Sequence, residues 1–478
     1  MTYSSDIPRR GIVEPGGASG HPNQRPRGLK RALSGRQVQM LAIGGVIGVG
    51  LFYGASLSVK IAGPAVLIGF VICGAIAAIV MRALGEMTVE RPVSGSFRDY
   101  AETQLGRGVG FVTGWMWWFF WTATVMSELA AIGKLIAFWF PHFPAWIPGF
   151  VALILFTVSN LLAVKVFGEV EYWFAILKVF AVALFMVFGL LIMLGGVFNH
   201  GHAVGVSSLW KYGGFMPNGV AAVFASLSLV VQAYSGIETL AVEAGETRNP
   251  VKNIRRAFRA VTVRILVLYI GSILIMLSAF PWTYLTAHSG SPYVLLFAKV
   301  GIPLAATVVN IIIIMSGLSS CNTGLYGGSR MLYSMAAESN PESVLARVNR
   351  NQVPHGAVWL TALMISIGTL ITYLAPNYVY IWITSASAFA SLWTWGVILV
   401  SELVFRTRAK RSGATIGMPM PLWPALPVVG LVLLIVAFIA ILTSPYTRVS
   451  VWSGLIFLFL LMGYYAVRGR KTYRMTQS

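Results

Sequence analysis

Three ionisable residues, Lys178, Glu128 and Glu238, lie inside long apolar segments of the sequence. A charged side chain within a membrane helix costs roughly 2.5–3.5 kcal/mol on insertion scales, so such residues usually have a partner or a function. Lys178 stands eight residues into the apolar segment that begins at residue 170, or about 12 Å along a helix. Because burial disfavours the charged form of an amine, a proton-coupling role is physically available to Lys178.

Each of these residues also has a structural interpretation. The long stem of Lys178 could carry its ammonium towards the nearer membrane surface, or the ammonium could pair with an acid. Glu238 follows a small-residue interruption, where it could be a gate or charge partner, or a hydrogen-bonded structural carboxyl. Glu128 lies in a segment whose many tryptophans we interpret as packing residues. There the structural interpretation is favoured over gating or charge pairing.

Two apolar segments are interrupted by small residues in a way that suggests broken helices. One contains GGVIGVG at residues 44–50, and the other contains YSGIE at residues 234–238. A broken helix frees N–H groups at the positive end of its dipole, which suit an anionic group, and carbonyls that suit a cation. Glycine fits such breaks because it adopts unusual dihedral angles and allows close approach to the backbone. We therefore predict a binding site formed by Ile47, Gly48, Val49, Gly50, Tyr234, Ser235, Gly236 and Ile237.

Both interruptions have simpler alternatives. Gly44 and Gly48 are four residues apart, a spacing that lets two membrane helices pack closely. Tyr234 could cover a bound molecule as a lid, or it could be an ordinary aromatic core residue.

The elements that carry these residues are expected to be membrane helices. The 478 residues are 57% hydrophobic and only 10% charged, with a mean hydropathy of +0.75, whereas soluble proteins carry about a quarter charged residues. Apolar runs of helix-spanning length recur, and the alternating segments of a membrane barrel do not. The sequence predicts an all-α, polytopic membrane protein with twelve spans, at residues 36–58, 64–88, 108–138, 147–165, 170–196, 219–245, 262–281, 300–334, 357–375, 379–404, 423–443 and 450–467.

The two interrupted spans indicate an internal repeat. They are the first and the sixth, as expected for two inverted repeats of five helices that each contain one discontinuous helix. We predict repeats over about 36–196 and 219–404, two extra helices within 423–467, and one membrane domain over 36–467. Residues 1–35 are read as a disordered tail and 468–478 as a second tail.

The distribution of basic residues predicts the orientation. The formal net charge is +20, and 29 of the 35 Lys and Arg residues lie in the tails or in and beside the connections after even-numbered spans, against five on the opposite side. Such a bias places both termini in the cytoplasm, here of a protein in the cytoplasmic (inner) membrane. The basic connections would face lipid headgroups. A nucleic-acid partner would require a basic soluble surface, which is not found.

Catalytic and metal sites are not indicated. The six histidines lie in tails or connections, and only the weak pair His200–His202 is closely spaced. The sequence has no phosphate-binding loop. We therefore expect neither an enzyme nor a metal or organic cofactor, and any coupling ion would be a proton.

The chain resembles the amino acid–polyamine–organocation superfamily, specifically its bacterial amino acid permease branch. The resemblance rests on six segments in the family's order, which are QMLAIGGVIGVGLF (39–52), GEM (85–87), PVSGSF (92–97), VFGEVEYWF (166–174), GETRNP (245–250) and SRMLY (329–333). It implies a substrate site at the two broken helices and amino acid uptake, in this branch commonly coupled to protons. Some relatives use a lysine at the place of Lys178, which supports a coupling role.

Two departures from the family pattern bear on function. Val49 stands where relatives often have Ser or Thr, so capture of a carboxylate would rest on backbone groups. Arg255 follows Ile254 where relatives often have a proline, which would alter only a helix start. The resemblance leaves open which amino acid is carried and whether the protein is a symporter, an exchanger, a facilitator or a nutrient sensor without transport. It leaves the oligomeric state open too.

Overall fold

The computed structural model consists of helices and their connections throughout the residues it describes, which confirms the all-α prediction. The described residues are 47–93, 95–162, 167–196, 203–244, 250–287, 291–299, 303–339, 342–349, 353–376, 378–445 and 447–469. The predicted first tail, all but the first two residues of the second tail, the first part of the predicted first span and most of the GETRNP motif therefore lie outside the described residues.

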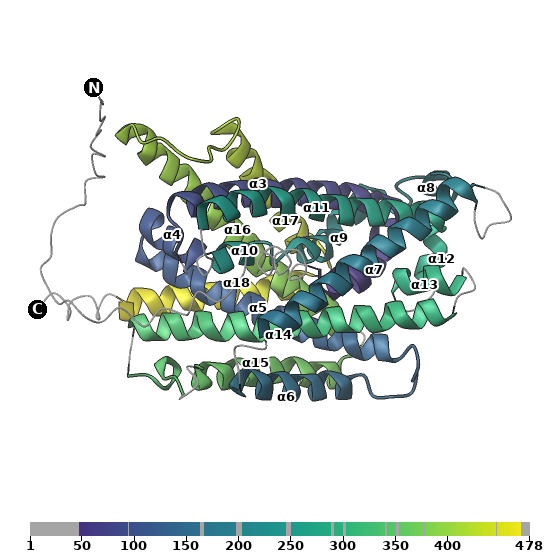
Figure 1. Cartoon of the computed structure of the whole chain (residues 1–478), viewed down its shortest axis with the longest axis horizontal. Helices are drawn as coiled ribbons and strands as arrows, with labels where there is room; N and C mark the ends of the chain where they lie inside the picture. The colour runs from purple at the N-terminus through teal and green to yellow at the C-terminus, as the bar shows by residue number, and fades with distance from the viewer. Residues whose placement is uncertain are drawn as a thin grey trace, which may run out of the picture.

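The α-helices form one elongated bundle (Figure 1). They are α2 (Ala55–Ala62), α3 (Val66–Glu90), α4 (Ser96–Leu105), α5 (Arg107–Ile136), α6 (Trp146–Leu162), α7 (Phe167–Gly195), α8 (Ser208–Lys211), α9 (Gly219–Tyr234), α10 (Thr239–Ala244), α11 (Pro250–Ala279), α12 (Trp282–Ala287), α13 (Pro292–Lys299), α14 (Pro303–Ser339), α15 (His355–Leu374), α16 (Val379–Ser412), α17 (Ala425–Thr443) and α18 (Arg448–Tyr464). A π-helical turn (Gly50–Gly54) leads into α2, and a second one (Tyr465–Gly469) follows α18.

Nine helical stretches within the described residues are long and apolar enough to cross a membrane. The first, Gly50–Glu90, contains the described part of the predicted spans 36–58 and 64–88. The predicted spans 147–165 and 262–281 correspond to shorter apolar helices, at Trp146–Leu161 and Ile265–Ala279. Apolar helix is thus found in every predicted span, but a total of twelve crossings stays a prediction.

Helix α5 is the centre of the bundle and carries Glu128. It packs mainly against α14 and α16, while α6 and α15 pair along one edge of the bundle (Figure 1). Large apolar side chains on the outer helices, such as Leu155 on α6 and Leu363 on α15, are more than 60% exposed. A surface of this kind is expected where helices face lipid.

The sixth predicted span is interrupted as its sequence suggests. Helix α9 ends at Tyr234, Ser235 is extended with ψ 150°, and Gly236 has φ +95° before α10 begins at Thr239. A side chain is strongly disfavoured at such a φ, which explains a glycine at this position.

Among the described residues of the first predicted span, from Ile47 on, helical structure begins at Val49 and continues through the π-helical turn into α2. Gly50, predicted to lie within the break, is instead the first residue of that turn. π-helical turns occur often at functional sites because they shift the backbone register.

Candidate functional site

A small cavity lies between the described start of the first predicted span and the interruption after α9. Its volume is about 20 Å³, room for about one water molecule. The lining residues come from the start of the first segment and from α5, α9, α14 and α16, and they are Gly48, Gly50, Phe120, Trp121, Thr124, Ser127, Glu128, Gln232, Ala233, Ser235, Ser320 and Tyr380.

The backbone at the start of the first segment is bound by side chains of α5 and α14. The amide N–H of Val49 donates to both carboxylate oxygens of Glu128, at 3.0 and 3.2 Å. The Ser316 hydroxyl donates to the carbonyl of Ile47 at 2.7 Å. A carboxylate therefore occupies the helix start at which the sequence predicted binding of an anionic group.

Gly48 and Gly317 provide the space for this carboxylate. A β-carbon added to Gly48 would overlap Glu128 Oε1, and it would lie 3.4 Å from Ser320 Oγ. A β-carbon on Gly317 of α14 would come within 2.7 Å of Val49 Cγ2 and 3.2 Å of Glu128 Oε2. The side chain of Val49 thus faces α14 and does not line the cavity, whereas its neighbours Gly48 and Gly50 do.

Glu238 braces the second interruption. Its Oε2 atom accepts hydrogen bonds from the Gly236 N–H and from Trp395 Nε1, both at 3.2 Å. Glu238 is fully buried and does not line the cavity. These contacts favour the structural interpretation of Glu238 over a gate.

Ser235 lines the cavity from the same interruption, whereas Tyr234 does not. The Tyr234 hydroxyl donates to the carbonyl of Phe70 at 3.0 Å, and its ring packs on Phe70 and Tyr269. Tyr234 is therefore a core aromatic in this conformation. Ile237, also predicted at the site, is buried and outside the cavity lining.

Lys178 lies on α7, deep in the bundle. Its side chain is 1% exposed, and its Nζ donates to the Ser319 hydroxyl on α14 at 2.9 Å. Glu171 and Glu128 both lie within electrostatic range of the ammonium. The side chain therefore stays inside the bundle rather than extending to the surface. This arrangement is compatible with both pairing and proton coupling.

Several polar and aromatic residues of the site were not predicted from the sequence. Gln232 Nε2 donates to Thr124 Oγ1 at 3.2 Å, and Thr124 is 2.7 Å from Ser387 Oγ, so an ordered polar group forms one wall. Trp121, interpreted from the sequence as a packing residue, lines the cavity, as does Tyr380. Of these residues only Gln232 offered a cue, because an uncharged amide within an apolar span usually has a partner.

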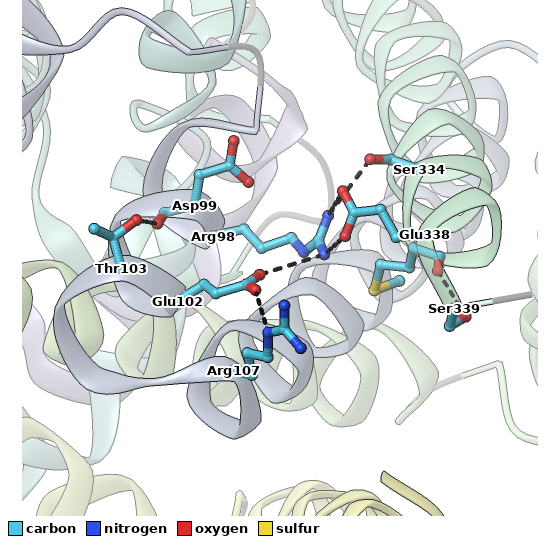
Figure 2. Close-up of polar contacts among 9 residues, drawn as sticks. Arg98, Asp99, Glu102, Thr103, Arg107, Ser334, Glu338 and Ser339 are labelled. Carbon is cyan, nitrogen blue, oxygen red and sulfur yellow. Dashed lines mark hydrogen bonds and ion pairs between the residues drawn. The ribbon is translucent and has the colours of Figure 1, made fainter. Parts of the chain in front are cut away.

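An ion-pair cluster lies apart from the cavity, where side chains join α4 to the end of α14 (Figure 2). The buried guanidinium of Arg98 donates to both carboxylate oxygens of Glu338, and to Ser334 Oγ at 3.4 Å. Glu102 lies 3.8 Å from Arg98 and 3.5 Å from Arg107. Two-point contacts of this kind fix the relative orientation of the elements that they join.

The described side chains include no group of three or more His, Cys, Asp or Glu that could hold a metal ion. Their two cysteines, Cys73 and Cys321, are free and buried.

Comparison with known proteins identifies the family. A model of the amino acid permease family matches residues 37–474. The chain is 40% identical to an uncharacterized amino acid permease of Bacillus subtilis, YtnA, over 92% of this chain and 95% of that protein. It is 37% identical to the probable threonine/serine transporter YbxG of the same organism, over 92% and 95% of the two chains. The aromatic amino acid transport protein AroP of Escherichia coli is also 37% identical, over 91% and 95%. The chain is a multi-pass membrane transporter, not an enzyme, and belongs to the amino acid permease family.

Proposed function

We propose that this permease is a secondary active transporter that imports an amino acid across the cytoplasmic membrane by proton symport. One observation carries the site assignment: the Val49 amide binds a carboxylate, that of Glu128, near a cavity that is also lined by Ser235 of the interruption after α9. An amino acid carries the same group on its α-carbon. Its carboxylate would take the Val49 N–H, and its ammonium would be held by carbonyls freed at the interruptions.

Binding would require the cavity to enlarge, because about 20 Å³ is far too small for an amino acid. Glu128 and the substrate carboxylate would compete for the same N–H, so Glu128 acts as an internal occupant that the substrate displaces. Glu128 thereby gates the site, a role that the sequence gave second place. Gly48, Gly50 and Ser235 would contact substrate directly, whereas Ile47, Gly236 and Ile237 would shape the backbone around it.

Alternating access requires that one end of the bundle close while the other opens. In the topology we propose, with twelve spans, inverted repeats over about 36–196 and 219–404 and both termini cytoplasmic, α4 lies at the cytoplasmic end. The contacts of Arg98 with Glu338 fasten α4 to α14 there (Figure 2). Closure at this end suits a state in which substrate has not yet been released to the cytoplasm.

Carboxylate recognition predicts a specific competition pattern. In proteoliposomes, a transported amino acid should compete with its own labelled uptake at least about tenfold better than its amide or the amine lacking the carboxylate, because a charged hydrogen bond contributes roughly 1.5–3 kcal/mol. A panel of aromatic, small neutral and basic amino acids identifies the substrate first. Equal competition by the decarboxylated amine would contradict the assignment of the Val49 amide.

Proton symport predicts uptake driven by an imposed pH gradient. With the cytoplasmic face inside and the outside more acidic, labelled substrate should accumulate above its outside concentration, and a protonophore should abolish that accumulation. Exchange against substrate inside the vesicle should persist. If only exchange or downhill flux is found, the permease is an exchanger or facilitator instead.

A further inference from the structure

A chain of hydrogen bonds joins Lys178 to a second buried acid, Glu171. Lys178 Nζ donates to Ser319 Oγ at 2.9 Å, and the Ser319 hydroxyl donates to Glu171 Oε2. Both ionisable residues are on α7, seven residues or about 10 Å apart along the axis, and Ser319 joins them from α14. Their side chains are at most 2% exposed.

Two amides hold Glu171 in this position. Asn322 Nδ2 donates to Glu171 Oε1 at 3.2 Å, and Asn322 Oδ1 in turn accepts from Asn160 Nδ2 at 3.0 Å. Asn160 Nδ2 also donates to the Phe156 carbonyl at 2.9 Å, within its own helix. Each carboxylate oxygen of Glu171 thus has its own donor, and Oε2 is directed at Ser319. A buried acid in an apolar bundle rarely has a separate donor from a neighbouring helix on each carboxylate oxygen unless its position matters.

We propose that Glu171 is the relay through which Lys178 exchanges its proton with the cytoplasmic side, an inference that rests on the coupling role proposed for Lys178. An N–H bond of the Lys178 ammonium breaks as its proton passes to Ser319 Oγ. The hydroxyl proton of Ser319 passes at the same time to Glu171 Oε2. The products are a neutral amine and a neutral carboxylic acid, and Ser319 is unchanged.

The relay suits a buried site because it leaves no isolated charge. A lone ammonium or carboxylate is expensive to bury, whereas the pair interconverts between two ions and two neutral groups with no change in total charge. Direct escape of a proton from Lys178 would instead leave Glu171 as an uncompensated anion. The protonated Glu171 would then release its proton when this end of the bundle opens.

The order of the groups gives the path a direction. Glu171 is near the start of α7, which is the cytoplasmic end of that helix in the proposed topology. On the cavity side, Lys178 is within electrostatic range of Glu128, which binds the Val49 amide. Protons would thus leave the substrate site through Lys178, Ser319 and Glu171 in that order.

If the relay exists, variants that disrupt it should impair proton-driven accumulation but not substrate exchange. In proteoliposomes, Glu171→Gln should lower accumulation driven by a pH gradient by at least roughly tenfold while exchange stays within about twofold, because only net uptake needs proton release. Ser319→Ala, which leaves both ionisable groups in place, should also lower accumulation. Glu171→Asp restores a carboxyl and should recover part of the accumulation, with a shifted dependence on internal pH.

Ser329→Ala is the matched control, because Ser329 is a buried serine of α14 whose hydroxyl donates within its own helix, to the Tyr326 carbonyl. Normal gradient-driven accumulation by Glu171→Gln, or by Ser319→Ala if the first variant does not reach the membrane, would overturn the relay. Parallel loss of exchange and accumulation in both variants would also overturn it, since Glu171 would then only brace the bundle. Failure of the unsubstituted protein to accumulate substrate would instead refute proton symport itself.

Discussion

Gly48→Leu is expected to abolish amino acid uptake while the protein still reaches the membrane. A β-carbon at residue 48 would overlap Glu128 Oε1 and crowd Ser320, so the larger side chain would fill the cavity beside the Val49 amide. Loss of a charged hydrogen bond together with steric exclusion should lower uptake by at least about a hundredfold. Labelled uptake into proteoliposomes, with the amount of inserted protein measured in parallel, tests this expectation.

Gly463→Leu is the control for Gly48→Leu, because an added β-carbon at residue 463 of α18 meets nothing within 4 Å. That variant should transport normally. Gly48→Ala should retain more activity than Gly48→Leu, since it adds only the β-carbon. Unimpaired uptake by Gly48→Leu would show that the glycine run serves helix packing rather than binding.

Substitution of Gly236 tests the second interruption through backbone strain rather than through a steric clash. A β-carbon there would have only Trp121 near it, at 4.0 Å, but φ +95° is a strained conformation for any other residue, by about 1–2 kcal/mol. Gly236→Ala should therefore reduce uptake by roughly tenfold. Gly396→Ala, a helical position with nothing within 4 Å, is the matched control.

The interruption after α9 could be predicted from the sequence because backbone chemistry is encoded locally, and that of the first span stays a prediction. A glycine between apolar runs indicates a positive φ, or a close approach of another group to the backbone, that a residue with a β-carbon cannot accommodate. Gly236 has the positive φ, and Gly48 has the close approach, from Glu128. Three of the buried ionisable residues, Lys178, Glu128 and Glu238, were found for a similar reason, since charge stands out in a sequence that is only 10% charged. The length, periodicity and composition of the apolar segments were sufficient to predict the helices themselves.

Partners across the bundle could not be predicted in this way. The contact between Val49 and Glu128 joins residues 79 positions apart, and that between Glu171 and Ser319 joins residues 148 apart. Without the packing of the helices, the sequence favours a structural role for Glu128 over gating. It leaves Tyr234 open between a lid and a core aromatic, and it indicates that Trp121 is a packing residue. Glu171 was overlooked because it stands at the edge of its predicted span, where an acid is ordinarily solvated.

Lys178→Met is expected to lose accumulation driven by a pH gradient, again by at least roughly tenfold, while exchange of substrate persists. The ammonium of Lys178 links α7 to Ser319 of α14 and lies within electrostatic range of Glu128, which binds the Val49 amide. When Lys178 is protonated, its charge can hold the Glu128 carboxylate after substrate has displaced it from the Val49 amide, so that substrate and proton are bound together. When Lys178 is neutral, that attraction is lost, Glu128 returns to the amide, and the substrate is released.

Methionine is unbranched and only one heavy atom shorter than lysine but cannot bind a proton, so Lys178→Met removes the coupling and leaves most of the packing. Lys60→Met, which replaces an exposed lysine of α2, is the control and should behave like the unsubstituted protein. The decisive measurement is the dependence of accumulation on external pH. An unchanged dependence in Lys178→Met, with substrate still concentrated against its gradient, would mean that the lysine only pairs with its neighbours and that the proton travels elsewhere. Loss of accumulation with intact exchange would place the proton on Lys178, because exchange needs the substrate site but no net movement of protons.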